Sequence, residues 1–381
     1  MIYFDNSATT KPYKEVLDSF ITVSSKHFAN PSSLHSFGGQ AEKLLSQARE
    51  QVAKLLQVRT NEIYFTSGGT ESNNLAIKGA AMQYRNRGKH LITTSIEHPS
   101  VRLAMEQLEQ EGFEITYLPV DEHGRVSLVD IEKAIRKDTI LLSVMLVNNE
   151  VGSIQPIKEI GELLTNYPTV LFHVDAVQGI GKVPLSLRKD RIDLCSFSGH
   201  KFHGLKGTGC LFVREGVRIT PLFSGGNQER QLRSGTENVA GAVALAKALR
   251  MTFEKGEPGI AHMKQIQGLL RAELSKNAAI HINTPIDNNA PHILNFSLRE
   301  IKSEVFIHAL EEKEIFVSTT SACSSKKKSA STTLLAMGVP ETLAESGIRI
   351  SLSFDSTLEE AVEAAAVIDK TVKQLGRIMN R

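Results

Sequence analysis

A lysine in the middle of the chain has the neighbours that a Schiff-base cofactor needs. Lys201 lies in the segment Ser198-Gly-His-Lys-Phe-His-Gly-Leu-Lys-Gly-Thr-Gly209, between two expected strands. An amine at a strand end can reach an aldehyde, while the hydroxyl of Ser198 and the imidazole of His200 can hold a phosphate. A glycine-rich loop with a solvated lysine has the same composition, so this segment alone leaves both interpretations open.

An aspartate further upstream favours the cofactor. Asp175 ends an apolar run in the segment His173-Val-Asp-Ala-Val-Gln178. A bare carboxylate is costly there unless a cation accompanies it. A protonated pyridine nitrogen would be such a cation, and its pairing with Asp175 would keep the ring an electron sink. The alternative is an aspartate that caps a helix.

Two other segments are expected at the ligand-binding edge of an α/β sheet. In Thr66-Ser-Gly-Gly-Thr-Glu-Ser-Asn73, glycines and hydroxyls lie between a strand and a helix, where free N–H groups and the helix dipole attract anions. The Walker Gly-Lys-Ser/Thr pattern does not follow, and a plain strand-to-helix turn is the alternative. In Glu97-His-Pro-Ser100, His98 follows an expected strand, so its ring can stack on a cofactor or move protons, unless it is a surface histidine.

The three cysteines fall into two kinds. Cys195 and Cys210 lie in apolar strand patterns and are expected in the core. Cys323 lies instead in the small, polar segment Thr319-Thr-Ser-Ala-Cys-Ser-Ser-Lys-Lys-Lys328. An exposed cysteine beside three lysines favours the thiolate and is nucleophilic; an incidental cysteine and a solvated lysine face are the alternatives. No Cys-x-x-Cys spacing occurs, so no metal site is expected.

Strand-like and helix-period segments alternate through the first two-thirds of the chain. This alternation predicts an α/β fold, in which a mostly parallel sheet has helices on both faces. The runs at 140–147 and 170–174 are apolar on successive residues, as strands buried on both faces should be. Residues 41–56 have the apolar stripe of a helix. The expected strands are 63–66, 90–94, 114–118, 140–147, 170–174, 193–197 and 209–213.

The pattern changes after about residue 255. The cluster Lys255-Gly-Glu-Pro-Gly259 contains helix breakers, and a long helical pattern follows it. Short strands at 293–298 and 348–353 and a C-terminal helix then predict a smaller α+β domain. We therefore expect a large α/β domain over 15–255, and a small domain that combines 1–14 with 256–381 and carries Cys323.

The composition excludes several classes of protein. The chain has 381 residues, of which 41% are hydrophobic, so it can form a core and is not a disordered chain. Its 44 basic and 42 acidic residues give a net charge of +2, so no direct nucleic-acid partner is expected. Three cysteines indicate a reducing compartment, and neither a signal peptide nor an apolar stretch of membrane-spanning length is visible. We expect a cytoplasmic protein with no membrane partner.

Together these segments resemble the cysteine desulfurases of the NifS/IscS kind, in the class V aminotransferase group of fold-type I pyridoxal-phosphate enzymes. The resemblance covers nearly the whole chain, from Tyr3-Phe-Asp-Asn-Ser-Ala-Thr-Thr10 to about Ser353. It implies a mostly parallel seven-stranded sheet flanked by helices, with a smaller α+β domain. The other matching segments are Asn30-Pro-Ser-Ser-Leu-His35, Asn148-Asn-Glu-Val-Gly152, Arg233-Ser-Gly-Thr-Glu-Asn238 and Ser346-Gly-Ile-Arg-Ile-Ser351.

The resemblance implies a site for pyridoxal 5'-phosphate. Lys201 would form the covalent link to the cofactor, Asp175 would pair with the pyridine nitrogen, and Gln178 would contact the ring oxygen. His98 would stack on the ring and assist proton transfer. The phosphate ligands would be Thr70, Ser198 and His200, with Thr236 of the partner subunit in a homodimer.

The resemblance also implies the substrate and the reaction. Arg349, with Asn30 and Asn148 nearby, would hold the carboxylate of L-cysteine, a task that suits a guanidinium fork. The thiolate of Cys323 would attack the substrate sulfur, so that L-alanine leaves and Cys323 carries a persulfide. A protein acceptor would then take the sulfur, either an iron–sulfur scaffold or an RNA- or cofactor-thiolating protein.

Two other functions remain open at this point. One is another class V enzyme, such as a small-amino-acid aminotransferase or a selenocysteine lyase; a transaminase needs no thiol at Cys323. The other is a phosphate-binding module without catalysis that uses the Gly68-Gly69 turn. That module leaves His98, Asp175 and Lys201 without a role.

Overall fold

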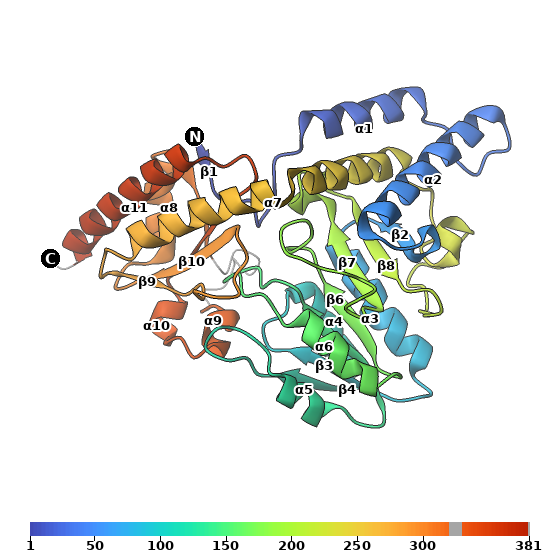
Figure 1. Cartoon of the computed structure of the whole chain (residues 1–381), viewed down its shortest axis with the longest axis horizontal. Helices are drawn as coiled ribbons and strands as arrows, with labels where there is room; N and C mark the ends of the chain where they lie inside the picture. Colours follow the sequence, from blue (N-terminus) through green and yellow to red (C-terminus); the bar gives the residue numbers. More distant parts are fainter. Residues whose placement is uncertain (320–329, 380–381) are drawn as a thin grey trace.

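The structure is a computed structural model, and it describes residues 1–319 and 330–379. Its largest element is a seven-stranded sheet with the order β2-β8-β7-β6-β5-β3-β4 (Figure 1). The strands, in that order, are Ile63–Thr66, Gly209–Val213, Leu194–Ser198, Leu171–Asp175, Thr139–Met145, His90–Thr94 and Glu114–Leu118. Each predicted strand is present, with bounds shifted by two residues at most.

The direction of the strands follows from the connections between them. The strands β7, β6, β5, β3 and β4 run parallel to one another, because the connections between them are long enough for crossovers. The connection 199–208 between β7 and β8 is too short for a crossover, so β8 returns antiparallel and pairs with both β7 and β2. The sheet is therefore mostly parallel, as the sequence predicts, and the short connection carries Lys201.

Both faces of this sheet are buried under helices. Successive residues of a strand point to opposite faces, as the neighbours Leu194 and Cys195 do. Leu194 packs with α3 (Gly69–Tyr84) and α4 (Pro99–Gln110) on one face. Cys195 packs on the other face, in a core that also contains Cys210, so both cysteines are core residues as expected. The helices of this second face are α1 (Lys14–Lys26), α2 (Ser36–Leu56), α5 (Leu128–Ala134), α6 (Ile157–Leu163) and the first half of α7 (Val239–Leu274).

A second core lies beside a four-stranded sheet of order β12-β13-β10-β9. Helices α8 and α11 and the second half of α7 cover it, and Figure 1 shows α7 in gold running from one core to the other. The breaker cluster at 255–259 does not end a helix, as the sequence suggests, but kinks α7 at Gly256, whose φ is 51°. The domain boundary near residue 255 stays a prediction. The elements of this part are β9 (Ile280–Ile282), β10 (Ile293–Leu298), α8 (Ser303–Glu311), β12 (Ser318–Thr319), α9 (Thr332–Ala336), α10 (Glu341–Ala344), β13 (Gly347–Ser351) and α11 (Leu358–Met379).

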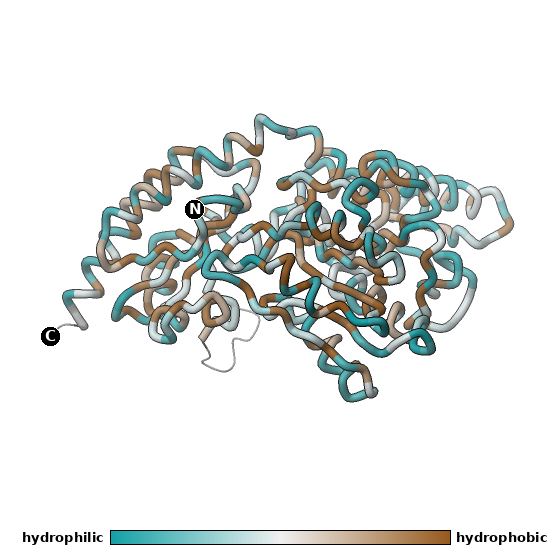
Figure 2. The backbone as a smooth tube through the Cα atoms, turned by 60° about the horizontal axis from the view of Figure 1, so that its bottom comes forward, coloured by the Kyte–Doolittle hydropathy of each residue, from teal (hydrophilic) through white to brown (hydrophobic). Residues whose placement is uncertain are grey.

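The N-terminal segment connects the two cores. Strand β1 (Ile2–Tyr3) pairs with β11 (Ile315–Phe316), and Asp5 then bridges to Ser351 at the end of β13. Five residues later, the amide of Thr10 donates to the carbonyl of His200, beside Lys201. Figure 2 shows brown, apolar chain concentrated along the strands in the interior. In the described part of the chain, no helix combines the length and the apolar character needed to cross a membrane.

Candidate active site

The predicted cofactor residues meet at the carboxyl ends of β6 and β7. Asp175 is the last residue of β6, Ser198 is the last residue of β7, and Lys201 follows in a single 3-10 turn, Gly199–Lys201. A cavity of about 460 Å³ opens beside them. Its lining residues are Ala8, Thr9, Ser67, Gly68, Gly69, Thr70, Glu71, Ser198, His200, Lys206 and Gly207. Three of the four predicted phosphate ligands therefore share one cavity.

Glycines let the backbone of the first turn of α3 approach this cavity closely. A Cβ atom on Gly209 would lie 2.5 Å from the Cα atom of Gly68, and one on Gly69 would lie 2.7 Å from Val177. A side chain on Gly209 would therefore shift the backbone, and one on Gly69 would displace the Val177 side chain. The bare N–H groups at the start of α3 point into a cradle that Thr70 completes, which is the arrangement that binds a phosphate. The residues present fit the phosphate end of the cofactor.

The Asp175 carboxylate is buried and is held by neutral donors. The side chain of Asn73 donates to Oδ2 over 2.7 Å, and the amide of Val177 donates to Oδ1 over 3.0 Å. Asp175 is only 5% exposed, and it forms no ion pair within the described residues. A buried carboxylate of this kind fits a protonated pyridine nitrogen. Asn73, which holds the Asp175 carboxylate, was not predicted as a site residue, although it ends the motif at 66–73.

His98 caps α4 and is fixed in one tautomer. The amide of Ser100 donates to Nδ1 over 3.1 Å, and the Ser100 hydroxyl lies 2.8 Å from the same atom. Because Nδ1 accepts, the proton of the neutral ring is at Nε2. Burial lowers the pKa of His98, so the ring is neutral at pH 7. The Asn73 side chain donates to the Ser100 hydroxyl over 2.9 Å, so one hydrogen-bonded chain runs from His98 to Asp175.

The amine of Lys201 lies against the N-terminal segment. Its Nζ atom donates to the carbonyls of Ser7 and Ala8 over 2.5 and 2.8 Å. The side chain of Gln178 donates to the same Ser7 carbonyl over 3.0 Å, and the Gln178 Oε1 atom is buried with no partner in the described residues. This orphaned acceptor next to Lys201 is a second observation that fits a bound ring. The motif at 3–10 is thus part of the site.

A second lysine lies behind Lys201. Lys182 is 3% exposed, and its amine donates to the backbone carbonyl of Lys201 over 3.0 Å. Burial, followed by the charge of Lys201, lowers the pKa of Lys182 to about 7. No sequence motif marks Lys182, apart from its place shortly after Gln178.

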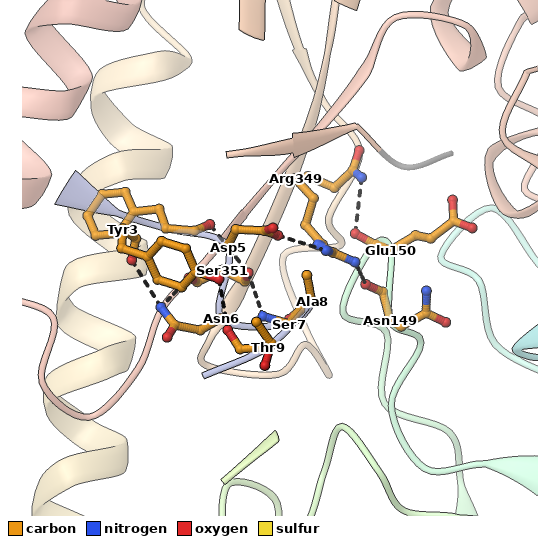
Figure 3. Close-up of polar contacts among 12 residues, drawn as sticks. Tyr3, Asp5, Asn6, Ser7, Ala8, Thr9, Asn149, Glu150, Arg349 and Ser351 are labelled. Atoms are coloured by element: carbon orange, nitrogen blue, oxygen red, sulfur yellow. Dashed lines mark hydrogen bonds and ion pairs between the residues drawn. The ribbon is translucent and has the colours of Figure 1, made fainter. Parts of the chain in front are cut away.

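The predicted substrate residues meet at the other end of the site. Arg349 in β13 donates from Nη1 to the carbonyl of Asn149 over 2.8 Å and from Nη2 to the carboxylate of Asp5 over 3.0 Å (Figure 3). Its Nε atom is buried and has no partner in the described residues. Asn148 is buried beside this contact and is held by the carbonyl of Ile96. Asp5 is the residue here that sequence reasoning missed, although it lies inside a quoted motif.

Asn30 does not join these residues within one chain. It lies in the connection between α1 and α2, and Figure 1 shows this connection at the opposite end of the molecule from β10 and its neighbours. The expectation that Asn30 is near Arg349 is therefore wrong for a single chain. The side chain serves a local turn instead, because its Oδ1 atom accepts the amide of Ser32 over 2.9 Å.

Thr236 also lies outside the phosphate cavity. Thr236 is exposed and lines a neighbouring cavity of about 220 Å³, together with Arg233 and Glu237. Cys323 and the lysines at 326–328 lie outside the described residues. Across residues 1–319 and 330–379, no group of three histidine, cysteine or acidic side chains could hold a metal ion.

Comparisons with known proteins agree with this geometry. The family model of the class V aminotransferases matches residues 2–364. A NifS/IcsS protein homolog from Lactobacillus delbrueckii subsp. bulgaricus is 48% identical over 99% of this chain and 99% of its own length. A cysteine desulfurase IscS from Methanosarcina thermophila is 44% identical over 98% of this chain and 92% of its own. A solved NifS-like protein has a TM-score of 0.92 and 40% identity, over 98% of this chain and 99% of its own.

The chain belongs to the class V aminotransferase family, and its cofactor is pyridoxal 5'-phosphate. The family and the fold predicted from the sequence are thereby confirmed.

Proposed function

We propose that this chain is a cysteine desulfurase, which converts L-cysteine to L-alanine and leaves the sulfur as a persulfide on Cys323. The observation that carries the proposal is one site with two ends. Lys201 and Asp175 lie at the cofactor end, and Arg349 lies at the end that suits an amino-acid carboxylate. Relatives named cysteine desulfurase, 41% to 44% identical over nearly the whole chain, support the same activity.

The cofactor supplies an electron sink for the negative charge that develops on the substrate α-carbon. The chain supplies the groups around it. Asp175 would keep the ring nitrogen positively charged, and Asn73 holds Asp175 in place. Thr70, Ser198 and His200 would hold the phosphate, and Gln178 would contact the ring oxygen with its side chain, whose Oε1 atom has no partner among the described residues.

Two residues hold the protons of the reaction. The Lys201 amine takes the α-proton of the substrate, and the carbonyls of Ser7 and Ala8 are placed to stabilise the resulting ammonium. His98 holds its proton at Nε2, because Nδ1 accepts from Ser100. The neutral ring can therefore donate a proton from Nε2 and stack on the cofactor without adding a charge.

The sulfur transfer balances without an external oxidant. The Cys323 thiolate attacks the substrate sulfur, so an S–S bond forms and the carbon–sulfur bond breaks. The electron pair of that bond stays on carbon, and a proton completes the methyl group of L-alanine. The thiol of Cys323 is oxidised to the persulfide, and the substrate carbon is reduced by the same two electrons.

The proposal also includes the oligomeric state, the sulfur acceptor and the cellular location of the protein. The family resemblance implies that Thr236 of the partner subunit would complete the phosphate site in a homodimer, and the exposure of Thr236 in one chain supports this role. The sulfur would pass to an acceptor for iron–sulfur assembly or for RNA or cofactor thiolation. The free cysteines Cys195 and Cys210 are consistent with the cytoplasm.

A combined assay tests the proposal. The purified protein is expected to be yellow, to release L-alanine when L-cysteine is added, and to carry a persulfide detected on the Cys323 peptide by mass spectrometry. Cys323→Ser should keep the colour and lose sulfur transfer. Full cysteine-dependent sulfide release by Cys323→Ser would overturn the mechanism. A yellow protein that makes no L-alanine would favour another class V activity.

A further inference from the structure

The phosphate end of the site has a shortage of positive charge. Thr70 and Ser198 are neutral hydroxyl ligands. Burial, followed by the charges of Lys201 and Lys206, lowers the pKa of His200 to about 4, so its ring is neutral at pH 7. A phosphate monoester has a charge of about −1.5 to −2 at pH 7, whereas a helix N-terminus supplies about half a positive charge. The remaining charge needs a cation.

The lining of the cavity contains two charged side chains, and one of them is already neutralised. Glu71 accepts from Arg233 over 2.8 Å, and from the amide of Ser67 over 3.0 Å. Its negative charge is therefore balanced by Arg233. The other charged residue is Lys206, which forms no ion pair within the described part of the chain.

Lys206 is well placed to face a ligand in this cavity. It lies on the connection between β7 and β8, next to Gly207, whose φ of 77° permits the turn. Its side chain is exposed. The charge of Lys206 acts on His200, which lines the same cavity.

We propose that Lys206 is a further cofactor-binding residue, the cation that balances the phosphate of the bound cofactor. This inference rests on the proposed function, because the phosphate belongs to pyridoxal 5'-phosphate. Lys206 contributes through charge, and Thr70, Ser198 and the first turn of α3 contribute through directed hydrogen bonds. The charge therefore discriminates the phosphorylated cofactor from the same ring without a phosphate.

The experiment compares two ligands that differ only in the phosphate. Cofactor-free protein is titrated with pyridoxal 5'-phosphate and with pyridoxal, and the dissociation constants are read from the visible absorbance. The ratio of the two constants isolates the contribution of the phosphate. Lys206→Met should weaken pyridoxal 5'-phosphate binding about fivefold to tenfold and leave pyridoxal binding unchanged. The loss should grow at low ionic strength, because salt screens the interaction.

Two control variants accompany this titration. Lys206→Arg keeps the charge and should keep the wild-type ratio. Lys189→Met removes the same charge from an exposed lysine that precedes β7, at the amino end of the strand and away from the cavity. It should leave both dissociation constants unchanged.

Other results would overturn the inference. An equal loss for both ligands in Lys206→Met would mean that Lys206 only supports the loop. The preference of the wild type for pyridoxal 5'-phosphate over pyridoxal could instead fall between pH 6 and pH 8, with both dissociation constants unchanged in Lys206→Met. His200 would then be the cation. A wild-type protein that bound pyridoxal 5'-phosphate no better than Lys201→Ala would refute the proposed function itself, and this inference with it.

Discussion

The cofactor end and the substrate end of the site are built in different ways. The cofactor end uses the carboxyl ends of adjacent strands, so Asp175 and Ser198 are neighbours because β6 and β7 pair in the sheet. The substrate end gathers Asp5, Asn149 and Arg349 from three distant parts of the chain. The first end depends on one rigid sheet, while the second depends on how the N-terminal segment lies between two cores. We therefore expect substitutions at the cofactor end to impair chemistry and those at the substrate end to impair binding.

The largest effect is expected for Asp175→Asn. The substitution removes the charge that pairs with the ring nitrogen, and its amide would meet the donating amide of Asn73. Loss of a buried ionic partner costs about 3–5 kcal/mol, so kcat should fall roughly a hundredfold to several thousandfold, with a small change in KM for L-cysteine. Steady-state kinetics checks this split. A rise in KM with no fall in kcat would contradict the expected difference between the two ends.

Asp5→Asn should have a smaller effect of the opposite kind. The variant keeps an oxygen that can accept from Arg349 but removes the charge, so the guanidinium is held less firmly. KM for L-cysteine should rise about threefold to tenfold, with kcat changed less than twofold. Kinetics over a range of L-cysteine concentrations measures both values. A lower KM would mean that Asp5 competes with the substrate carboxylate instead of positioning Arg349.

The same difference explains how much of the site the sequence predicts. Motifs that follow strands locate the cofactor end, because the carboxyl ends of parallel strands lie at one edge of the sheet. Asp175 and Ser198 come together for this reason. Asn30 does not reach Arg349 in one chain, because no strand pairing links the α1–α2 connection to β13. Asp5 was missed because its role depends on a long-range contact, and Lys182 because burial of a lysine leaves no local pattern.

The fold shows the same limit at α7. Glycine and proline at 256–259 predict a break, and in an isolated helix they would cause one. In the protein, the helix resumes after a kink at Gly256, because residues on both sides pack into separate cores. Tertiary packing thus overrides a local signal.

A substitution inside the hydrogen-bonded chain should have a moderate effect. Ser100→Ala removes the hydroxyl that links His98 to Asn73, while the backbone contact of Ser100 to His98 remains. Loss of one buried hydrogen bond costs about 1 kcal/mol, so kcat should fall roughly fivefold with KM unchanged. Ser95→Ala is the matched control, because the Ser95 hydroxyl is buried with no partner in the described residues. Equal kcat values for the two variants would mean that the hydrogen bond from Ser100 does not contribute to catalysis.

The smallest effect on activity is expected for Glu97→Gln. Glu97 is 6% exposed, and its Oε1 atom accepts from Thr94 and from the amide of Met145. Burial raises the pKa of Glu97 to about 8, so the folded protein holds this carboxyl protonated at pH 7. Glutamine keeps the accepting oxygen and carries no charge either, so kcat and KM should stay within about twofold of wild type.

The pH dependence of stability sharpens this last prediction. The pKa of Glu97 is higher in the folded state than in the unfolded state, so its contribution to stability is fully present below about pH 4.5. The contribution declines as the pH rises toward 8, by up to about 1.4 kcal/mol per pH unit. Glu97→Gln removes this decline. The unfolding midpoint of the variant, relative to that of the wild type, should therefore increase between pH 5 and pH 8. Parallel unfolding curves at every pH would mean that Glu97 is ionised in the folded protein, and the carboxyl beside His98 would then be a second buried charge at the cofactor end.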